Sequence, residues 1–207
     1  ARALLVATNA YHLPVPGIPA PAYRPVNYCQ FATVPIPDSL RERILPGGEG
    51  CWDTALVMSS IRIDQAGRMI VGGIGDASGP IAPVHHGWAR RKLRAIFPEL
   101  GDLPFEHVWT GRIAMTGDHI PKIVTFGPDA CSVFGYSGRG IGPGTTFGAA
   151  AARALLSGDT TTLPLSPRPA HTETFTGIRG AYFEFGASVI HARLPSGEEL
   201  LLAGQKS

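Results

Sequence analysis

A glycine-dense turn, FGYSGRGIGPG (residues 134–144), runs directly into TTFGAAAARALL (residues 145–156), and the rest of the chain is best understood from this junction. The second segment is rich in alanine and leucine and predicts a helix. Glycines let backbone N–H groups approach a ligand closely, and a helix N-terminus carries roughly half a positive charge. The junction therefore predicts a site for an anionic or electron-rich ligand atom. The alternative is a strand-to-helix connection whose glycines supply only positive φ angles.

Length and composition indicate one compact, turn-rich domain, or one domain with a piece of another. Charged residues make up 16% of the 207 residues, and the chain contains 26 glycines and 19 prolines. A formal net charge of +2 is too small to indicate nucleic acid or a membrane surface as the partner. No apolar run reaches the ~18 residues of a transmembrane helix. We therefore expect a small molecule or a protein as the partner.

Neither the cysteines nor the histidines suggest a metal site. Cys29, Cys51 and Cys131 are far apart and odd in number, without the paired spacing of a zinc site or a disulfide framework. The adjacent His85 and His86 would point in different directions on a helix, and we expect them at the surface. These patterns predict a cytoplasmic protein without a bound metal.

The start of the chain resembles the middle of a larger protein. Residues 4–7, LLVA, form a short apolar run of the kind found in a buried parallel strand, but nothing precedes it to complete such a sheet. An initiator methionine and a signal peptide are also absent. We expect that the sequence begins within a longer polypeptide.

The pattern along the rest of the chain predicts mainly strands. The prolines of residues 13–25 exclude a regular helix and indicate an extended crossing segment. Alternation of apolar and polar residues predicts strands at 28–34, 105–114, 123–126 and 131–134. It also predicts a β-hairpin at 53–73, with its first strand from residue 54, and another in the tail, where 181–194 would turn back along 198–202. Helical spacing predicts helices at 38–45 and 83–100. This order predicts an α+β fold whose first and last elements belong beside another domain.

Segments from four regions, in this order, resemble the D-amino-acid-oxidase-like family of FAD-dependent oxidoreductases. They are LLVATNAY (4–11), Asp53 with RIDQAGRMIVGG (62–73), WTG (109–111) with TGDHIP (116–121), and GYSGRG (135–140). The resemblance covers about residues 1–160 and is closest to the branch of γ-glutamylputrescine oxidase, glycine oxidase and sarcosine oxidase. It implies that residues 1–12 end an FAD-binding Rossmann domain and that 13–130 form an antiparallel substrate domain. Residues 131–160 would return to the FAD domain, and 161–207 would form the tail with its hairpin.

The resemblance also implies a cofactor and its contacts. The residues carried over to FAD binding are Thr8, Asn9, Ser137, Gly138, Arg139, Gly140 and Ile141. Sarcosine-oxidase-like relatives attach the flavin to a cysteine where this chain has Gly111, so the resemblance implies non-covalent FAD. Tyr136 and Asp118 are the candidate substrate-binding residues; the alternatives are that Tyr136 only packs and that Asp118 caps a turn. No residue is assigned as catalytic.

The reaction implied is oxidation of an amine or amino acid by hydride transfer from the carbon beside nitrogen to flavin N5, with imine hydrolysis and reoxidation by O2. An Arg that holds the substrate carboxylate in glycine-oxidase-like relatives is Ile113 here, which favours an amine. The G-x-G-x-x-G fingerprint that grips FAD is absent from this sequence. We therefore expect the isolated chain to be inactive and to need an N-terminal FAD-binding half or a partner chain, and homo-oligomers are also possible. A non-catalytic or split-subunit module that docks on a separate flavin domain is the alternative.

Overall fold

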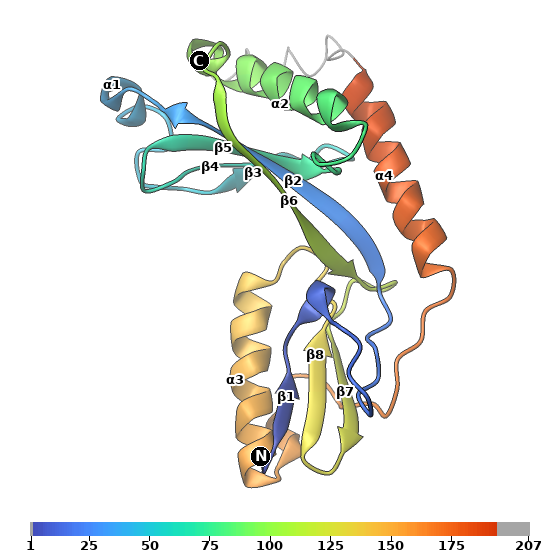
Figure 1. Ribbon diagram of the computed structural model, residues 1–207. Coiled ribbons are helices and arrows are strands. Elements are labelled where there is room, and N and C mark those ends of the chain that lie inside the picture. The colour runs from blue at the N-terminus through green and yellow to red at the C-terminus, as the bar shows by residue number, and fades with distance from the viewer. Residues whose placement is uncertain (1, 194–207) are drawn as a thin grey trace. The chain divides into compact units, whose positions relative to one another are not determined.

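The computed structural model describes residues 2–193, which divide into two compact units. Unit 1 combines residues 2–26 with Arg112–Ala181, and unit 2 combines Asn27–Gly111 with residues 182–193 (Figure 1). These limits differ from the domain limits expected from the sequence. Residues 13–26 and 112–130 belong to the same compact unit as the first strand and the glycine turn.

Unit 1 is built on a small mixed sheet of β1 (Leu4–Val6), β8 (Ala130–Phe134) and β7 (Lys122–Gly127), in that order. β7 and β8 form an antiparallel hairpin, whereas β1 pairs in parallel with β8. Helix α3 (Ile141–Ser157) packs on β1 and β8 (Figure 1). The buried core between helix and sheet consists of Ile123, Cys131, Val133, Phe147 and Ala151.

Helix α3 begins four residues earlier than the sequence pattern predicted, because its first turn accommodates the glycines and a proline. Pro143 lies in that first turn, where its missing N–H costs no helical hydrogen bond. The helix ends at Gly158, whose φ of 74° provides a left-handed C-cap. Strand β1 is half covered rather than fully buried, and Leu4 is 42% exposed.

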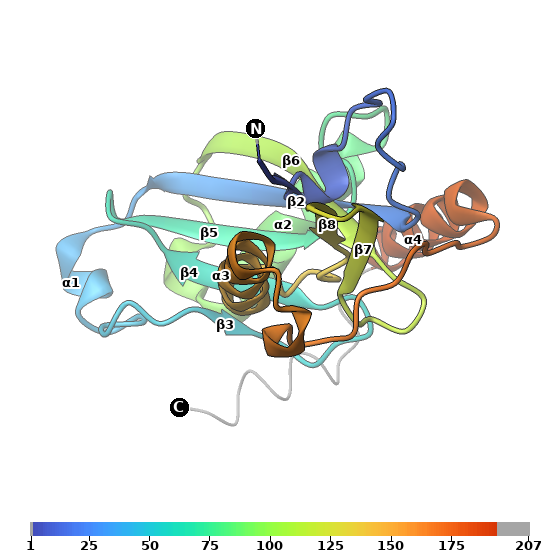
Figure 2. The ribbon, with the colours of Figure 1, turned by 90° about the horizontal axis from the view of Figure 1, so that it is seen from below.

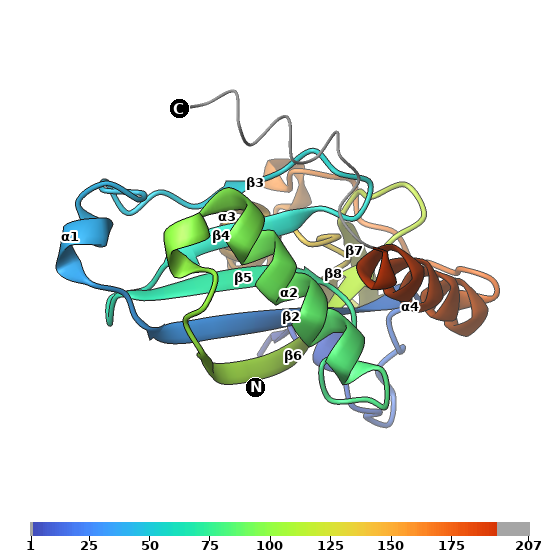
Figure 3. The same cartoon turned by 90° about the horizontal axis from the view of Figure 1, so that it is seen from above.

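Unit 2 is built on a five-stranded sheet in the order β3-β4-β5-β2-β6 (Figure 2). The strands are β3 (Cys51–Trp52), β4 (Ser59–Ile63), β5 (Arg68–Ile74), β2 (Arg24–Pro35) and β6 (Phe105–Met115), the last two of which also extend into unit 1. The pairs β3–β4, β4–β5 and β5–β2 are antiparallel. Helix α2 (Ala82–Ile96) crosses one face of this sheet (Figure 3). Its Leu93 joins Phe31, Met69 and Val71 in the core.

The expected mixture of helices and antiparallel sheet is confirmed. The predicted strand at 28–34 lies within β2, the helix at 83–100 becomes α2 and the 3₁₀ turn Pro98–Leu100, and the strands at 105–114, 123–126 and 131–134 are β6, β7 and β8. The hairpin is shorter than predicted, because residues 54–58 are not part of a strand. Helix α1 (Asp38–Arg41) covers only the first half of the predicted helix at 38–45.

The prediction of a tail hairpin was wrong for residues 181–192. Helix α4 (Thr176–Ala192) occupies this segment, and the predicted return strand at 198–202 lies outside the described residues. The buried positions Gly180, Ala187 and His191 recur at helical spacing, while Tyr182 and Phe185 are exposed. Small side chains on the packed side and aromatic side chains on the exposed side concealed the helical pattern.

No helix among residues 2–193 is both long enough and apolar enough to cross a membrane. Within the same residues, His, Cys, Asp and Glu side chains form no group of three that could hold a metal ion.

Candidate functional site

The parallel pairing of β1 with β8 brings two distant loops to one edge of the unit 1 sheet. Leu4, Leu5 and Val6 lie opposite Ala130, Cys131 and Ser132, so both strands end at the same edge. Thr8 and Asn9 follow β1 there, and the glycine turn follows β8. Loops at the carboxyl ends of parallel strands are the usual ligand sites of α/β sheets. The structure thus brings together the two separate segments that the sequence assigned to cofactor binding.

A hydrogen bond joins these two loops directly. The side-chain oxygen Oδ1 of Asn9 accepts the backbone N–H of Gly135 at 3.0 Å. Asn9 has a φ of 47°, a left-handed conformation that asparagine tolerates better than most residues. Gly135 has a φ of 83°, and a Cβ there would collide with the Thr116 methyl group. The Asn9 side chain therefore holds the glycine turn in position, and it can do so without contacting a ligand.

Ser137 fixes the turn to the end of β6 within unit 1. Its backbone N–H donates to the Ala114 carbonyl at 3.1 Å, and its Oγ accepts the N–H of Thr116 at 3.2 Å. The same hydroxyl donates to the Gly135 carbonyl at 3.3 Å. Because Ser137 also has a positive φ of 52°, these bonds hold a strained backbone conformation in place.

Beyond Ser137 the turn presents free backbone donors. Arg139 is internally bonded, since its N–H donates to the Tyr136 carbonyl at 3.0 Å. Several other N–H groups here have no hydrogen-bond partner within residues 2–193: those of Gly138, Gly140, Ile141 and Gly142. They lie at the N-terminus of α3, where no side chain caps the helix. Free donors at the positive end of a helix dipole favour an electron-rich acceptor.

The space around the turn suits a flat ligand edge. A Cβ on Gly138, whose φ is 87°, would meet only the Ile113 Cδ1 atom, at 3.6 Å. A Cβ on Gly142 would meet nothing within 4 Å. The free N–H donors are therefore accessible. The N1 and O2 edge of a flavin, which is an acceptor and gains negative charge on reduction, fits this set.

Thr8 and Arg139 lie at the margin of this arrangement. The Oγ1 atom of Thr8 is 3.5 Å from Nδ1 of His12, within its own loop. The side chain of Arg139 is exposed, and no carboxylate among residues 2–193 forms an ion pair with it. A free guanidinium beside the turn adds positive charge to that of the helix terminus.

Tyr136 is a packing residue on one side and is accessible on the other. Its ring meets Phe147 edge to face, with centroids 6.4 Å apart, and lies beside Gly140. Burial raises the pKa of its phenol, so the side chain stays neutral. The half-buried ring lies next to the free N–H groups, which is the position expected for a side chain that lines a ligand site at this turn.

Asp118 caps the turn between β6 and β7. Its Oδ1 accepts the N–H of Ile120 at 3.1 Å, and its Oδ2 pairs with Lys122 Nζ. Partial burial raises the pKa of Asp118, but the bonds from Lys122 and Ile120 outweigh it and lower the pKa to about 2. Lys122 is only 5% exposed, so its ammonium depends on this carboxylate. Among the described residues, no hydrogen bond joins Asp118 to Tyr136.

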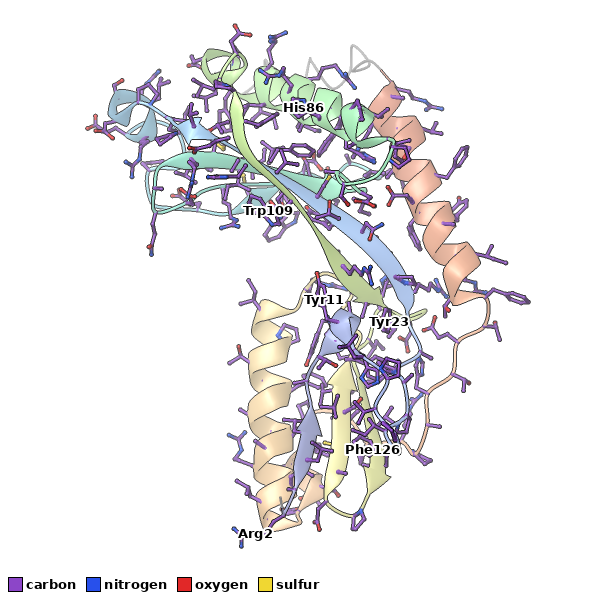
Figure 4. The ribbon with its side chains drawn as sticks, viewed as in Figure 1. Arg2, Tyr11, Tyr23, His86, Trp109 and Phe126 are labelled. Atoms are coloured by element: carbon purple, nitrogen blue, oxygen red, sulfur yellow. The ribbon has the colours of Figure 1, made fainter. Side chains whose placement is uncertain are left out.

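Two tyrosines that the sequence pattern did not indicate support the loop after β1 (Figure 4). The phenol oxygen of Tyr11 accepts the N–H of Arg112 at 2.8 Å, and the phenol of Tyr23 donates to the Ala10 carbonyl at 3.0 Å. Both bonds lie within unit 1 and hold the 3₁₀ turn Asn9–Tyr11. No spacing in the sequence indicated these partners.

Unit 2 contains a buried histidine pair where the sequence suggested surface histidines. His85 and His191 are both fully buried, and their Nδ1 atoms are 2.8 Å apart. The Trp88 ring stacks on His191 at 3.9 Å, and Glu184 Oε1 lies 3.4 Å from His85 Nε2. The surface expectation failed for His85 because α4 packs its last turns against α2 at this point.

Comparison with known proteins identifies the family. Residues 1–154 match the family described as FAD dependent oxidoreductase (DAO). The chain belongs to this family. The glycine turn and its free N–H groups fall inside the matched region, as do Thr8 and Asn9. Membership in the DAO family implies that FAD is the cofactor.

Two curated relatives of this DAO family chain carry the same name. A probable oxidoreductase OrdL of Rhizobium meliloti is 33% identical over 100 residues, which cover 47% of this chain and 23% of the relative. A probable oxidoreductase OrdL of Haemophilus influenzae is 25% identical over 163 residues, which cover 75% of this chain and 36% of the relative. The chain thus matches well under half the length of these relatives.

Solved structures show the same DAO-like fold. Fructosyl amine:oxygen oxidoreductase (Amadoriase I) from Aspergillus fumigatus aligns with a TM-score of 0.51 and 18% identity, over 66% of this chain and 35% of that one. A double-cysteine mutant of Amadoriase I from the same organism aligns with a TM-score of 0.56 and 15% identity, over 91% of this chain and 44% of that one.

Proposed function

We propose that this chain is part of an FAD-dependent oxidoreductase that oxidises an amine or an amino acid, with unit 1 contributing the edge that holds the flavin ring. One observation supports the proposal most strongly: free N–H donors gather at the N-terminus of α3, at the edge where β1 and β8 both end. Such a set stabilises negative charge on a bound ring without any side chain.

The residues of unit 1 divide into ligands and supports. The N–H groups of Gly138, Gly140 and Ile141 would donate to the N1 and O2 edge, and the exposed Arg139 would add positive charge. Asn9 and Ser137 would hold the turn in place through the bonds described above. Thr8 would border the same edge. Since Gly111 offers no thiol for attachment, we propose that FAD binds without a covalent bond.

The bound flavin would supply the redox step, in which a hydride leaves the carbon beside the amine nitrogen, water hydrolyses the imine, and O2 accepts the electrons. The protein has to orient the amine and exclude water. Tyr136 would form one wall of this site with its neutral ring. Asp118 would contact a substrate through its own carboxylate, which already pairs with Lys122. The name of the structural relative, a fructosyl amine:oxygen oxidoreductase, supports oxidation of a C–N bond with oxygen as acceptor.

A comparison of two glycine variants tests the flavin site. Gly138 and Gly158 flank α3, and both have positive φ angles with no crowding of a Cβ closer than 3.6 Å. Gly138→Ala and Gly158→Ala should therefore destabilise the chain by similar amounts, about 1 kcal/mol. Riboflavin binding, followed by quenching of flavin fluorescence, should weaken several-fold in Gly138→Ala only. Equal binding by the two variants, or no flavin effect with the unmodified chain, would overturn the proposal.

A further inference from the structure

The segment that connects α3 to α4 is anchored on the sheet of unit 1. The N–H of Arg168 donates to the Ile123 carbonyl, and the Arg168 carbonyl accepts the Thr125 N–H, both at 2.9 Å. Three residues further on, the ring of His171 packs on the buried Phe134, the last residue of β8, with ring centroids 6.0 Å apart. The connecting segment therefore runs along β7 and reaches the point where the glycine turn begins.

Glu173, in the same segment, is a buried carboxylate. Its side chain is 8% exposed, and its Oε1 accepts the backbone N–H of Gly117 at 2.6 Å. The same Oε1 lies 3.3 Å from Nε2 of His171, and Oε2 lies 3.2 Å from Nε of Arg24. Neither Oε2 nor Arg24 Nε has a hydrogen-bond partner among residues 2–193. The Arg24 contact is thus an ion pair without a directed bond, and the shortest hydrogen bond of Glu173 holds Gly117.

The Arg24–Glu173 pair lies directly on the backbone of Gly117. A Cβ on Gly117 would lie 2.8 Å from Nη2 of Arg24 and 3.5 Å from Oε1 of Glu173. The φ of Gly117 is not in the left-handed region, so the backbone itself does not require glycine. The absence of a side chain at Gly117 is what allows the two charged groups to approach the turn between β6 and β7 so closely.

Thr116 connects this contact to the glycine turn. The N–H of Gly117 and the carbonyl of Thr116 belong to one planar peptide, so the bond to Glu173 fixes the backbone directly after Thr116. Thr116 is fully buried and donates its own N–H to Ser137 Oγ at 3.2 Å. Its methyl group also occupies the space that a Cβ on Gly135 would need. The position of Thr116 thus determines where two residues of the glycine turn lie.

We propose that Glu173 is a positioning residue for the flavin edge. It holds Thr116 against Ser137, and it thereby fixes the free N–H donors that follow Ser137 without contacting the flavin itself. Glu173 lies beyond residues 1–154, the region that matches the family. This inference rests on the proposed function, because it names a support of the same flavin edge.

The test compares two variants of Glu173 by NMR of the isotope-labelled chain without flavin. Glu173→Ala removes the acceptor, and water can solvate the exposed Gly117, so the turn should be released while the fold is kept. The backbone amide signals of Ser137 and Gly138 should then shift. Glu173→Gln keeps Oε1 as an acceptor and should leave these signals near their original positions. A role limited to the charge of Arg24 would instead make the two variants alike, which would overturn the inference.

Riboflavin binding, followed by fluorescence quenching, gives the functional readout. Glu173→Ala should weaken binding about fivefold, the equivalent of one misplaced hydrogen bond, and Glu173→Gln should recover most of the loss. Asp159→Ala is the matched control, because it removes another carboxylate that accepts a backbone N–H after α3, that of Thr161 at 2.9 Å. Asp159→Ala should change neither riboflavin binding nor the signals of Ser137 and Gly138.

A double variant keeps the test decisive if Glu173→Ala does not fold. Arg24→Met with Glu173→Leu replaces the ion pair by apolar side chains, an exchange that proteins often tolerate, and still removes the acceptor of Gly117. Unchanged Ser137 and Gly138 signals in either folded variant, or equal shifts in Asp159→Ala, would overturn the inference. The signals are recorded without flavin, so they decide the role of Glu173 even if the unmodified chain does not bind riboflavin, a result that would overturn only the proposed function.

Discussion

Asn9 Oδ1 accepts the Gly135 N–H at 3.0 Å across a separation of 126 residues, and this bond ties the loop after β1 to the loop after β8. Gly135 is buried, so its N–H has no water to replace the lost partner. The glycine turn then continues from a fixed point to the free donors at the start of α3. The bond therefore links the stability of unit 1 to the geometry of the proposed flavin edge.

Asn9→Ala should destabilise unit 1 by about 2–3 kcal/mol, through an unpaired buried N–H and a left-handed φ that alanine disfavours. Asn9→Asp keeps an acceptor and tolerates the φ, so it should recover most of the loss. Urea denaturation followed by far-UV circular dichroism measures both variants. If Asn9→Asp is as unstable as Asn9→Ala, the hydrogen bond is not the cause.

Gly135→Ala should be among the most destabilising single changes in unit 1. The added Cβ would require a φ of 83° and would collide with the buried Thr116 methyl group, so we expect a loss of about 2–4 kcal/mol. Gly158→Ala, which has a φ of 74° and open space, should lose only about 1 kcal/mol. Denaturation midpoints of the two variants give the difference, and equal midpoints would contradict the collision.

Gly142→Leu should weaken riboflavin binding about tenfold without destabilising the chain. Leucine is a better helix former than glycine, and a side chain here meets no protein atom nearby, so it projects into the space over the free donors. Gly148→Leu is the matched control on the same helix, where a Cβ also meets nothing within 4 Å. Fluorescence titration of both variants should show a defect only in Gly142→Leu. A defect of the same size in Gly148→Leu would point to helix α3 in general.

Unit 2 should lose stability as the pH falls from 7 to 5. Burial and the positive charges of His85, Lys92 and Arg91 lower the pKa of His191 to about 3. Burial likewise lowers the pKa of His85, against the opposing effect of the nearby Glu184 and Asp76. Both histidines are neutral when folded and take up protons when unfolded, at a pKa of about 6.5, so their contribution is complete above that pH and declines below it.

Tryptophan fluorescence reports this transition, because Trp52, Trp88 and Trp109 all lie in unit 2. His191→Gln should reduce the slope of unfolding free energy against pH between 7 and 5. His107→Gln makes the same substitution at a half-exposed histidine of the same unit and is the matched control. Identical slopes in His191→Gln and the unmodified chain would show that the buried pair does not control the response.

Asp118→Asn should destabilise unit 1 by about 1–3 kcal/mol, because it leaves the buried Lys122 ammonium without its carboxylate. The half-exposed position of Asp118 keeps the loss below that of a fully buried pair. Lys122→Met, which removes the charge as well, should recover part of the stability in the Asp118→Asn background. Thermal denaturation of the single and double variants gives the coupling, and purely additive losses would exclude it.

The sequence was sufficient for much of the fold. Apolar alternation placed β2, β6, β7 and β8, and helical spacing placed α2, because in each case one face is buried and the other is not. The same logic failed for α4. There the packed side consists of small or polar residues such as Ala187 and His191, so the aromatic residues that suggested strands mark the exposed side. Amphipathic pattern alone cannot assign an element whose larger side chains point to solvent.

The candidate site was predictable in its backbone and not in its side chains. Glycine density before a helix gave the free donors of Gly138 and Gly140, since it depends only on local conformation. The hydrogen bond that Asn9 accepts from Gly135 depends on strand register, which brings distant residues together. Local pattern does not contain that information.

The parallel pairing of β1 with β8 also orders events during folding. Leu5 and Cys131 are as far apart in sequence as Asn9 and Gly135, so closing this strand pair carries a large loop-entropy cost. The β4–β5 hairpin, in contrast, needs only a four-residue turn and can close as soon as it is synthesised. On a ribosome, β1 must wait with an open edge until β8 has emerged. Refolding of unit 1 is accordingly expected to be the slower phase, and the interval before β8 arrives is when this chain is most open to aggregation.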